Sequence, residues 1–303
     1  MLSTKWLNKI PAHRKGLVYI SFTALLWSSS GLFIKILSLD AFQISFYRSG
    51  IAALTVLIVS TIRSRTSSKS IKLQFDGLSI LSSFFFAGIL IFFVIATKKT
   101  TAANAIFLQF TAPIYLLVLE PIFLKIKFEP KNIIAIAVTI FGMMLFFFGR
   151  LEIGSIHGNL IAIASGICFA CFALLLKKKR IEKKSENTLN SVILGNAIVA
   201  LVSFFVVFPD FGLSFTETLI LLYMGIFQIG VSYMIFNEGI KYVSATESMI
   251  IATMEAIFNP IWVFLGIGEV PSIYAIAGGI VIMSAILWRN LSRRTKEKMM
   301  IVE

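Results

Sequence analysis

Ionisable residues inside long apolar stretches are the first candidates for chemistry in this sequence. Arg48 and Glu255 each lie within such a stretch, and Lys35 lies near the end of another. A charged side chain at membrane depth costs at least about 2.5 kcal/mol on insertion scales, so such residues usually have a function. A fixed cation can bind a carboxylate, and a carboxyl group can take up and release a proton. These residue types therefore indicate solute binding and proton transfer.

Glu255 belongs to a stripe of residues at every fourth position, which lie on one slowly turning face of a helix. The stripe consists of Glu247, Ile251, Glu255 and Asn259. Because desolvation favours the neutral form of a buried carboxyl group, such a group can exchange protons reversibly. We predict this proton-coupling role for Glu255. The alternative is a permanent ion pair with Arg48 or Lys35.

The two cations each allow more than one interpretation. Arg48 keeps its charge in proteins, so it either binds a substrate carboxylate, pairs with an acidic residue or extends to the interface. Trp27, Gly31 and Lys35 are spaced four apart, which places them on one helix face. An aromatic ring below a cation can hold a partly apolar carboxylate. Alternatively, Lys35 extends to the interface and Trp27 packs against lipid or a neighbouring helix.

Uncharged polar side chains within other apolar stretches form a third group of candidates. Such groups either contact a solute or hold helices together by hydrogen bonds. The predicted substrate-binding residues of this kind are Asn104, Gln109, Gln228, Tyr233, Asn237 and Asn259. Together with Trp27, Lys35 and Arg48, they make up the predicted binding site.

The elements that must position these residues are membrane-spanning helices. The chain has 303 residues, of which 57% are hydrophobic and only 14% charged. A helix needs about 20 apolar residues to cross the hydrocarbon core of a bilayer. Stretches of this kind run over 17–34, 41–62, 77–97, 100–119, 132–149, 158–176, 187–209, 218–237, 243–266 and 270–288. We predict an all-α membrane protein with ten transmembrane helices.

The basic residues follow the same rhythm. Most of the 28 Lys and Arg residues lie in the N-terminal tail, in every second break and at the C-terminal end. By the positive-inside rule, both termini are predicted to be cytoplasmic, in a cell inner membrane. The net charge of +13 is thus explained by topology, and no nucleic-acid partner is predicted.

The two halves of the chain resemble each other at an offset of 143 residues, with 93–105 aligned to 236–248 and Lys98 to Lys241. Near the start the offset is 142, which pairs Trp27 with Phe169. An odd number of spans in each half inverts the second half relative to the first, as in many secondary transporters. The predicted division is 1–150, with a basic tail over 1–16, and 151–290, followed by a basic tail over 291–303.

Short motifs in both halves are similar to one known family. The first half contains Ala24-Leu25-Leu26-Trp27-Ser28, then Lys35, then Phe46-Tyr47-Arg48. A repeated signature reads Ala102, Pro113 and Glu129 in the first half, and Ala245, Glu255 and Glu269 in the second. From about residue 16 to 290, the chain resembles the EamA branch of the drug/metabolite transporter superfamily. Ser28 stands where the family usually has glycine, and Pro260 does not directly follow Glu255.

The resemblance implies ten helices around a central cavity, lined by helices 1–4 and 6–9, with helices 5 and 10 at the periphery. It also implies transport of small metabolites, often amino acids or their relatives and commonly outward. We therefore predict a secondary active transporter of a small polar metabolite that works by alternating access, with proton coupling through Glu255. The alternatives are exchange of S-adenosylmethionine or a nucleotide-like metabolite, and a membrane sensor that transports nothing.

Enzyme activity, cofactors and metals are not predicted. The two histidines, His13 and His157, lie on opposite sides of the predicted membrane, and Cys168 and Cys171 have no histidine nearby. No phosphate-binding Gly-x-x-x-x-Gly-Lys-Ser/Thr loop occurs. The predicted partners are a small-molecule substrate, the lipid bilayer and protons, and the predicted assembly is a monomer or a homodimer.

Overall fold

The computed structural model of the protein describes residues 11–66, 76–125, 130–145, 147, 153–183, 189–208, 210–243 and 245–302. Within these ranges every regular element is a helix. The predicted boundary at residue 150, the first ten residues of the N-terminal tail and Glu129 lie outside the described residues, as does the side chain of Glu247.

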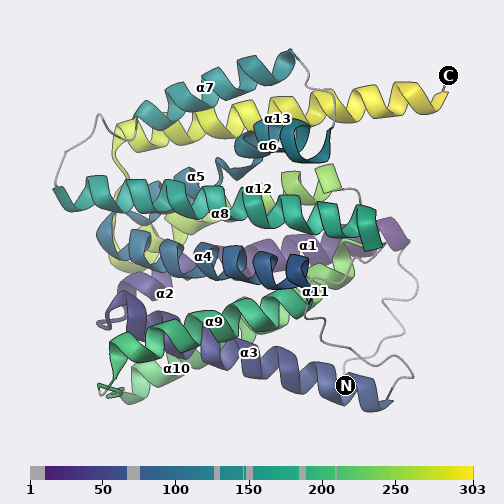
Figure 1. The fold of residues 1–303 in the computed structure, drawn as a ribbon. Coiled ribbons are helices and arrows are strands. Elements are labelled where there is room, and N and C mark those ends of the chain that lie inside the picture. The colour runs from purple at the N-terminus through teal and green to yellow at the C-terminus, as the bar shows by residue number, and fades with distance from the viewer. Residues whose placement is uncertain are drawn as a thin grey trace.

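The helices form a bundle whose axes run roughly along one direction (Figure 1). In chain order they are α1 (Ala12–Ser28), α2 (Ser30–Ile36), α3 (Ala41–Thr66), α4 (Gly77–Lys99), α5 (Ala102–Gln109), α6 (Ala112–Leu124), α7 (Lys131–Leu145), α8 (Ile153–Lys183), α9 (Leu189–Val207), α10 (Phe215–Tyr223), the π-helix η2 (Met224–Val231), α11 (Ser232–Gly239), α12 (Ala245–Ile267) and α13 (Ile273–Val302).

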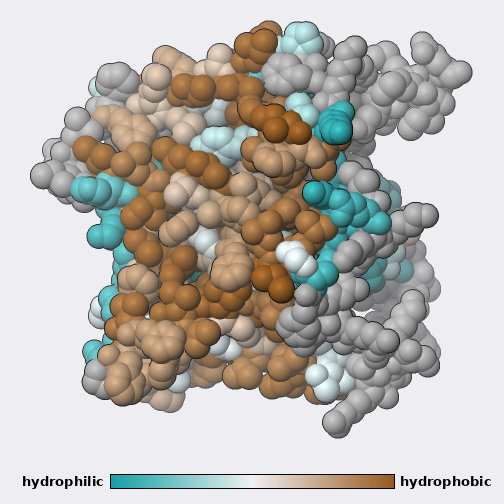
Figure 2. All heavy atoms as spheres, viewed as in Figure 1, coloured by the Kyte–Doolittle hydropathy of each residue, from teal (hydrophilic) through white to brown (hydrophobic). Residues whose placement is uncertain are grey.

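The described chain contains seven helical stretches that are long and apolar enough to cross a membrane. They are Ala12–Ile36, Ala41–Ile62, Gly77–Lys99, Ala102–Leu124, Ile156–Lys179, Leu189–Val207 and Phe215–Gly239, and shorter apolar helices cover Asn132–Leu145, Ile251–Ile267 and Ile273–Arg289. Figure 2 shows apolar residues over the middle of one face, with hydrophilic residues toward its left and right edges. Large apolar side chains such as Phe205 and Ile122 are mostly exposed, as expected of surfaces that face lipid. These findings confirm an all-helical, multi-pass membrane protein.

Two of the predicted spans are interrupted, which the apolar pattern did not indicate. The first breaks at Ser29, between α1 and α2, where the hydroxyls of Ser28 and Ser29 donate to carbonyls of the preceding turn. Such side-chain bonds compete with the helical ladder. The fourth breaks at Phe110 and Thr111, and α6 then begins with Pro113 in its first turn. Because proline has no N–H to donate, it is tolerated there.

The first break is held by two other segments of the chain. Trp262 Nε1 donates to Ser28 Oγ at 2.9 Å, and Asn259 Nδ2 donates to Ser30 Oγ at 3.2 Å, so both bonds come from α12. From α10, the hydroxyl of Tyr223 lies 3.2 Å from Ser29 Oγ. The polar groups of the break are therefore satisfied within the bundle, as lipid requires.

The α7 and α13 helices pack together along one edge of the bundle, while α3, α9 and α10 lie toward the opposite edge (Figure 1). Arg289 Nε on α13 donates to Asn132 Oδ1 on α7 at 2.6 Å. This peripheral pair corresponds to helices 5 and 10 of the predicted order. The α13 helix continues to Val302, through the stretch predicted to be a tail.

The eighth predicted span also differs from a regular helix, because its middle is the π-helix η2. This segment packs closely on α3 at Gly225, where a methyl group would lie 2.5 Å from Ile51 Cβ and 3.0 Å from the Arg48 carbonyl oxygen. Only glycine allows this approach. It fixes η2 against the segment of α3 that carries Arg48.

We expect Gly225→Ala to lower the melting temperature of the purified protein, because overpacking of this kind costs about 1–3 kcal/mol. The control is Gly77→Ala, since a methyl group at Gly77 meets no atom within 4 Å. Melting temperatures that fall equally in both variants would contradict close α3–η2 packing.

Candidate functional site

Arg48 is a buried cation that lacks an acidic partner in the described chain. Its side chain is 1% exposed, and its one hydrogen bond to the described residues runs from Nη2 to the carbonyl oxygen of Leu90 at 3.3 Å. Among the same residues Nε has no hydrogen-bond partner. A guanidinium offers five donors, so most of its capacity is unused. The arrangement suits an anion that enters from elsewhere.

Further buried polar groups without partners among the described residues lie on the same helix as this cation and on η2. Ser45 and Ser49, on the same part of α3, are fully buried, and their hydroxyls have no hydrogen-bond partner. Gln228 lies on η2, which packs against α3; it is 4% exposed, and its Oε1 is also unpaired. A buried polar group without a partner costs about 1–3 kcal/mol. A polar ligand that bonded to these groups would remove that cost.

Tyr233 is close enough to both Arg48 and Glu255 for their charges to act on its hydroxyl group. Glu255 is half-buried on α12 and makes no hydrogen bond or ion pair within the described chain. The alternative prediction, a permanent ion pair with Arg48 or Lys35, is therefore not what the structure contains. One cation and one carboxyl group thus lie in the neighbourhood of the same tyrosine.

Aromatic rings adjoin this polar group. The ring of Trp27 lies 4.8 Å from that of Tyr233 and 5.3 Å from that of Phe236, and the Phe86 ring lies 5.1 Å from Tyr233. Trp27 Nε1 donates to Ser232 Oγ at 2.8 Å. The Ser232 hydroxyl in turn bonds to the carbonyl oxygen of Gln228 in η2. The position of the indole thus depends on the π-helix.

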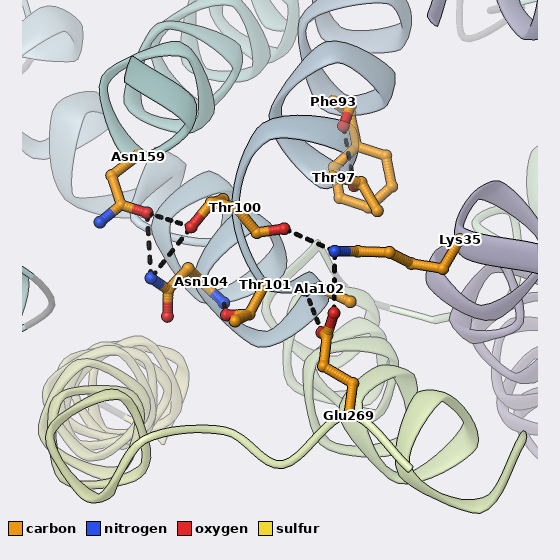
Figure 3. Close-up of polar contacts among 9 residues, drawn as sticks. All are labelled: Lys35, Phe93, Thr97, Thr100, Thr101, Ala102, Asn104, Asn159 and Glu269. Carbon is orange, nitrogen blue, oxygen red and sulfur yellow. Dashed lines mark hydrogen bonds and ion pairs between the residues drawn. The ribbon is translucent and has the colours of Figure 1, made fainter. Parts of the chain in front are cut away.

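Lys35 belongs to a second polar network, at the end of the bundle where α4 meets α5 (Figure 3). Its Nζ lies 2.8 Å from Glu269 Oε2 and donates to the Thr100 carbonyl oxygen at 2.8 Å. The other carboxylate oxygen of Glu269 accepts a bond from the backbone N–H of Ala102 at 2.8 Å. The lysine is therefore well paired.

Asn104 lies in the same network, on the far side of Thr100 (Figure 3). Its Nδ2 donates to Asn159 Oδ1 at 3.0 Å and to Thr100 Oγ1 at 3.2 Å, while the Thr100 hydroxyl donates to Asn159 at 2.8 Å. Leu90, which bonds Arg48, precedes Thr100 by ten residues, which is about 15 Å of helix. The predicted site residues thus fall into two groups rather than one.

Gln109 and Asn259 hold helices together. Gln109 Nε2 donates to Ser165 Oγ at 2.7 Å, and this hydroxyl donates to the carbonyl of Ile89, next to Leu90. Asn259 is fully buried and bonds to Ser30, although its Oδ1 is unpaired. Asn237 is half-buried on α11, one turn beyond Tyr233.

The predicted arrangement of Trp27 below Lys35 is wrong. Trp27 contacts α11, whereas Lys35 reaches Thr100 and Glu269, because the helix breaks at Ser29 between them. Sequence reasoning also missed Ser45, Ser49 and Asn159. No periodicity marks these three, because small polar residues are frequent throughout the chain. Glu269 stood in the repeated signature, but its partner was not predicted.

Comparison with known proteins identifies the family. The sequence profile of the EamA-like transporter family matches residues 14–148 and again residues 156–291. The chain belongs to the EamA-like transporter family. The resemblance predicted from short motifs is confirmed, and the family identifies the protein as a membrane transporter.

Similar proteins cover nearly the whole chain. An uncharacterized transporter of Clostridium kluyveri is 28% identical over an alignment of 295 positions, which covers 89% of this chain and 91% of the relative. An uncharacterized transporter of Archaeoglobus fulgidus is 24% identical over 91% of this chain and 97% of its own. Human solute carrier family 35 member G1 is 25% identical over 92% of this chain and 79% of its own.

A solved crystal structure of another protein has the same fold. It aligns with 89% of this chain and 96% of its own length, with a TM-score of 0.63 at 15% identity. At this identity the likeness concerns the fold alone. The likeness therefore supports the arrangement of helices described above and carries no information on the chemistry of the site.

Proposed function

We propose that this EamA-family protein is a secondary active transporter of a small polar metabolite that carries a carboxylate, such as an amino acid or a related compound. The observation that carries the proposal is the buried guanidinium of Arg48, which has one hydrogen bond and no acidic partner within the described chain. A permanent cation is costly in a membrane protein unless something pairs with it. A substrate carboxylate supplies that pair.

Other residues of the site supply the remaining contacts to the substrate. Gln228 and Tyr233 supply polar groups that can bond to the substrate backbone, and the unpaired Oε1 of Gln228 accepts a hydrogen bond. The rings of Trp27 and Phe86 offer an apolar surface beside Tyr233. Since charge-assisted hydrogen bonds are stronger than neutral ones, Arg48 dominates affinity and the others set orientation.

Glu255 is the group we propose for proton coupling. It is half-buried, makes no ion pair within the described chain and shares Tyr233 with Arg48. In its charged form it can bind a proton or the ammonium group of an amino acid. Because the proton and the ammonium group compete for this carboxylate, binding of a proton on one side of the membrane would release the substrate there. Return of the proton would then drive efflux of the substrate.

The proposed movement follows from the proposed topology. We take the ten apolar helical units to be ten spans in two inverted halves, with both termini in the cytoplasm of a cell and the protein in its inner membrane. The two tandem matches to the family profile support two related halves. Interrupted helices near the site are typical of transporters whose halves rock about a central site. Asn104, Gln109, Asn237 and Asn259 then hold helices together around that site.

The role of Arg48 can be tested by counterflow in proteoliposomes. Proteoliposomes that contain the purified protein are preloaded with unlabelled metabolites. Labelled amino acids, and then labelled S-adenosylmethionine, are added outside. We expect exchange of a carboxylate-bearing label, reduced at least about tenfold by Arg48→Gln, because hydrogen bonds to a charged group contribute about 1.5–3 kcal/mol. The matched control is Arg14→Gln, at an exposed position of α1.

Equal exchange by Arg48→Gln and the unmodified protein would contradict the proposed site. A folded protein that binds a metabolite but exchanges none would instead favour the sensor.

The role of Glu255 is tested by separating exchange from net transport. Because glutamine resembles a permanently protonated glutamate, we expect Glu255→Gln to retain counterflow but to lose the accumulation driven by an imposed pH gradient. Glu217→Gln, at an exposed helix start, serves as the control. Gradient-driven accumulation that persists in Glu255→Gln would show that this residue does not couple protons.

A further inference from the structure

The network around Lys35 joins segments that are far apart in the sequence (Figure 3). Lys35 ends α2, Thr100 follows α4, and Glu269 lies in the turn between α12 and α13. Lys35 belongs to the first stretch matched by the family profile and Glu269 to the second. The ion pair therefore connects the two halves of the transporter at one end of the bundle.

This ion pair is shielded and its partners are well satisfied. The side chains of Lys35 and Glu269 are only 18% and 20% exposed. Both carboxylate oxygens of Glu269 are used, one by Lys35 and the other by the backbone N–H of Ala102. Ala102 begins α5, and a carboxylate is favoured at a helix N-terminus. Separating α2 from the α12–α13 turn would break the ion pair and leave a shielded lysine and carboxylate without each other.

The internal repeat assigns a counterpart to Lys35. The offset of 142 that pairs Trp27 with Phe169 also pairs Lys35 with Lys177 on α8. Lys177 Nζ lies 2.6 Å from Glu120 Oε1 on α6. This second ion pair also joins the two matched stretches, since Glu120 lies in the first and Lys177 in the second.

The two ion pairs lie at opposite ends of the bundle. Asn159, near the start of α8, bonds to Thr100 beside Lys35, whereas Lys177 lies near the end of the same helix. The separation of eighteen residues corresponds to about 27 Å of helix. The central group around Arg48 bonds to Leu90, partway along α4, between these ends.

We propose that Lys35–Glu269 and Lys177–Glu120 are two latches, one at each end, that must open in turn to expose the central site to one side of the membrane or the other. This inference rests on the proposed function, because the two ends need to open in turn only in a transporter. Both latches are closed in this structure. Weakening one latch raises the population of the state that is open at that end. The size of the shift is set by how much more the ion pair stabilises the closed state than the open one.

The test uses accessibility, so it does not require the substrate. Gln228→Cys, beside the central site, is introduced after Cys168 and Cys171 have been replaced by serine. A membrane-impermeant maleimide is then added from one side or the other. We expect Glu269→Gln to raise labelling from the Lys35 side about fivefold or more, and Lys177→Gln to raise it from the opposite side.

The control is Glu238→Gln, which breaks an ion pair with Lys241 that lies within one half. It should leave labelling from both sides unchanged. A merely structural role for the Lys35–Glu269 pair would raise labelling from both sides alike.

Labelling that Glu269→Gln leaves unchanged, or raises equally from both sides, would overturn the latch. The result is distinguishable from failure of the proposed function. Side-selective labelling of the cysteine variants, without any counterflow by the protein that retains Gln228, would contradict the transporter proposal and retain the latches, whereas counterflow by that protein without side-selective labelling would do the reverse.

Discussion

A permanent positive charge buried among apolar helices is the constraint on which the account of this protein depends. Arg48 cannot lose its proton and is almost wholly shielded, yet within the described chain it bonds to one backbone carbonyl. The surrounding elements keep other donors and acceptors unpaired as well, at Gln228 and Ser49. Such a cluster stabilises a folded protein poorly by itself. It is readily understood as a site that is completed by a substrate.

The irregular helices explain how an apolar bundle can present such a site. The break at Ser29 ends the helix of Trp27, and η2 places Ser232 where it holds the indole against Tyr233. The close contact at Gly225 brings η2 onto α3 beside the Arg48 carbonyl. Regular helices would satisfy the hydrogen-bonding groups of their own backbones and would approach each other less closely. Departures from regularity therefore bring the polar groups together, while the polar networks at either end connect the two halves.

The sequence predicted the helices and the family well, because a bilayer demands long apolar stretches and leaves clear marks in composition. It also indicated Arg48, Tyr233 and Glu255 as candidate site residues, since polar groups are costly at membrane depth, and their roles stay predictions. It did not predict the break at Ser29, and so it placed Trp27 and Lys35 on one face. Nor did it predict that Lys35 pairs with Glu269, because that contact depends on how distant segments pack.

The most direct test of the central claim compares a carboxylate with its neutral amide. For whichever labelled metabolite the reconstituted protein exchanges, the unlabelled acid and the corresponding carboxamide are offered as competitors. If the Arg48 guanidinium binds the carboxylate, the acid should compete at least about tenfold better than the amide, because only the acid provides a charge-assisted pair. Equal competition by the two would show that the buried cation does not recognise the substrate.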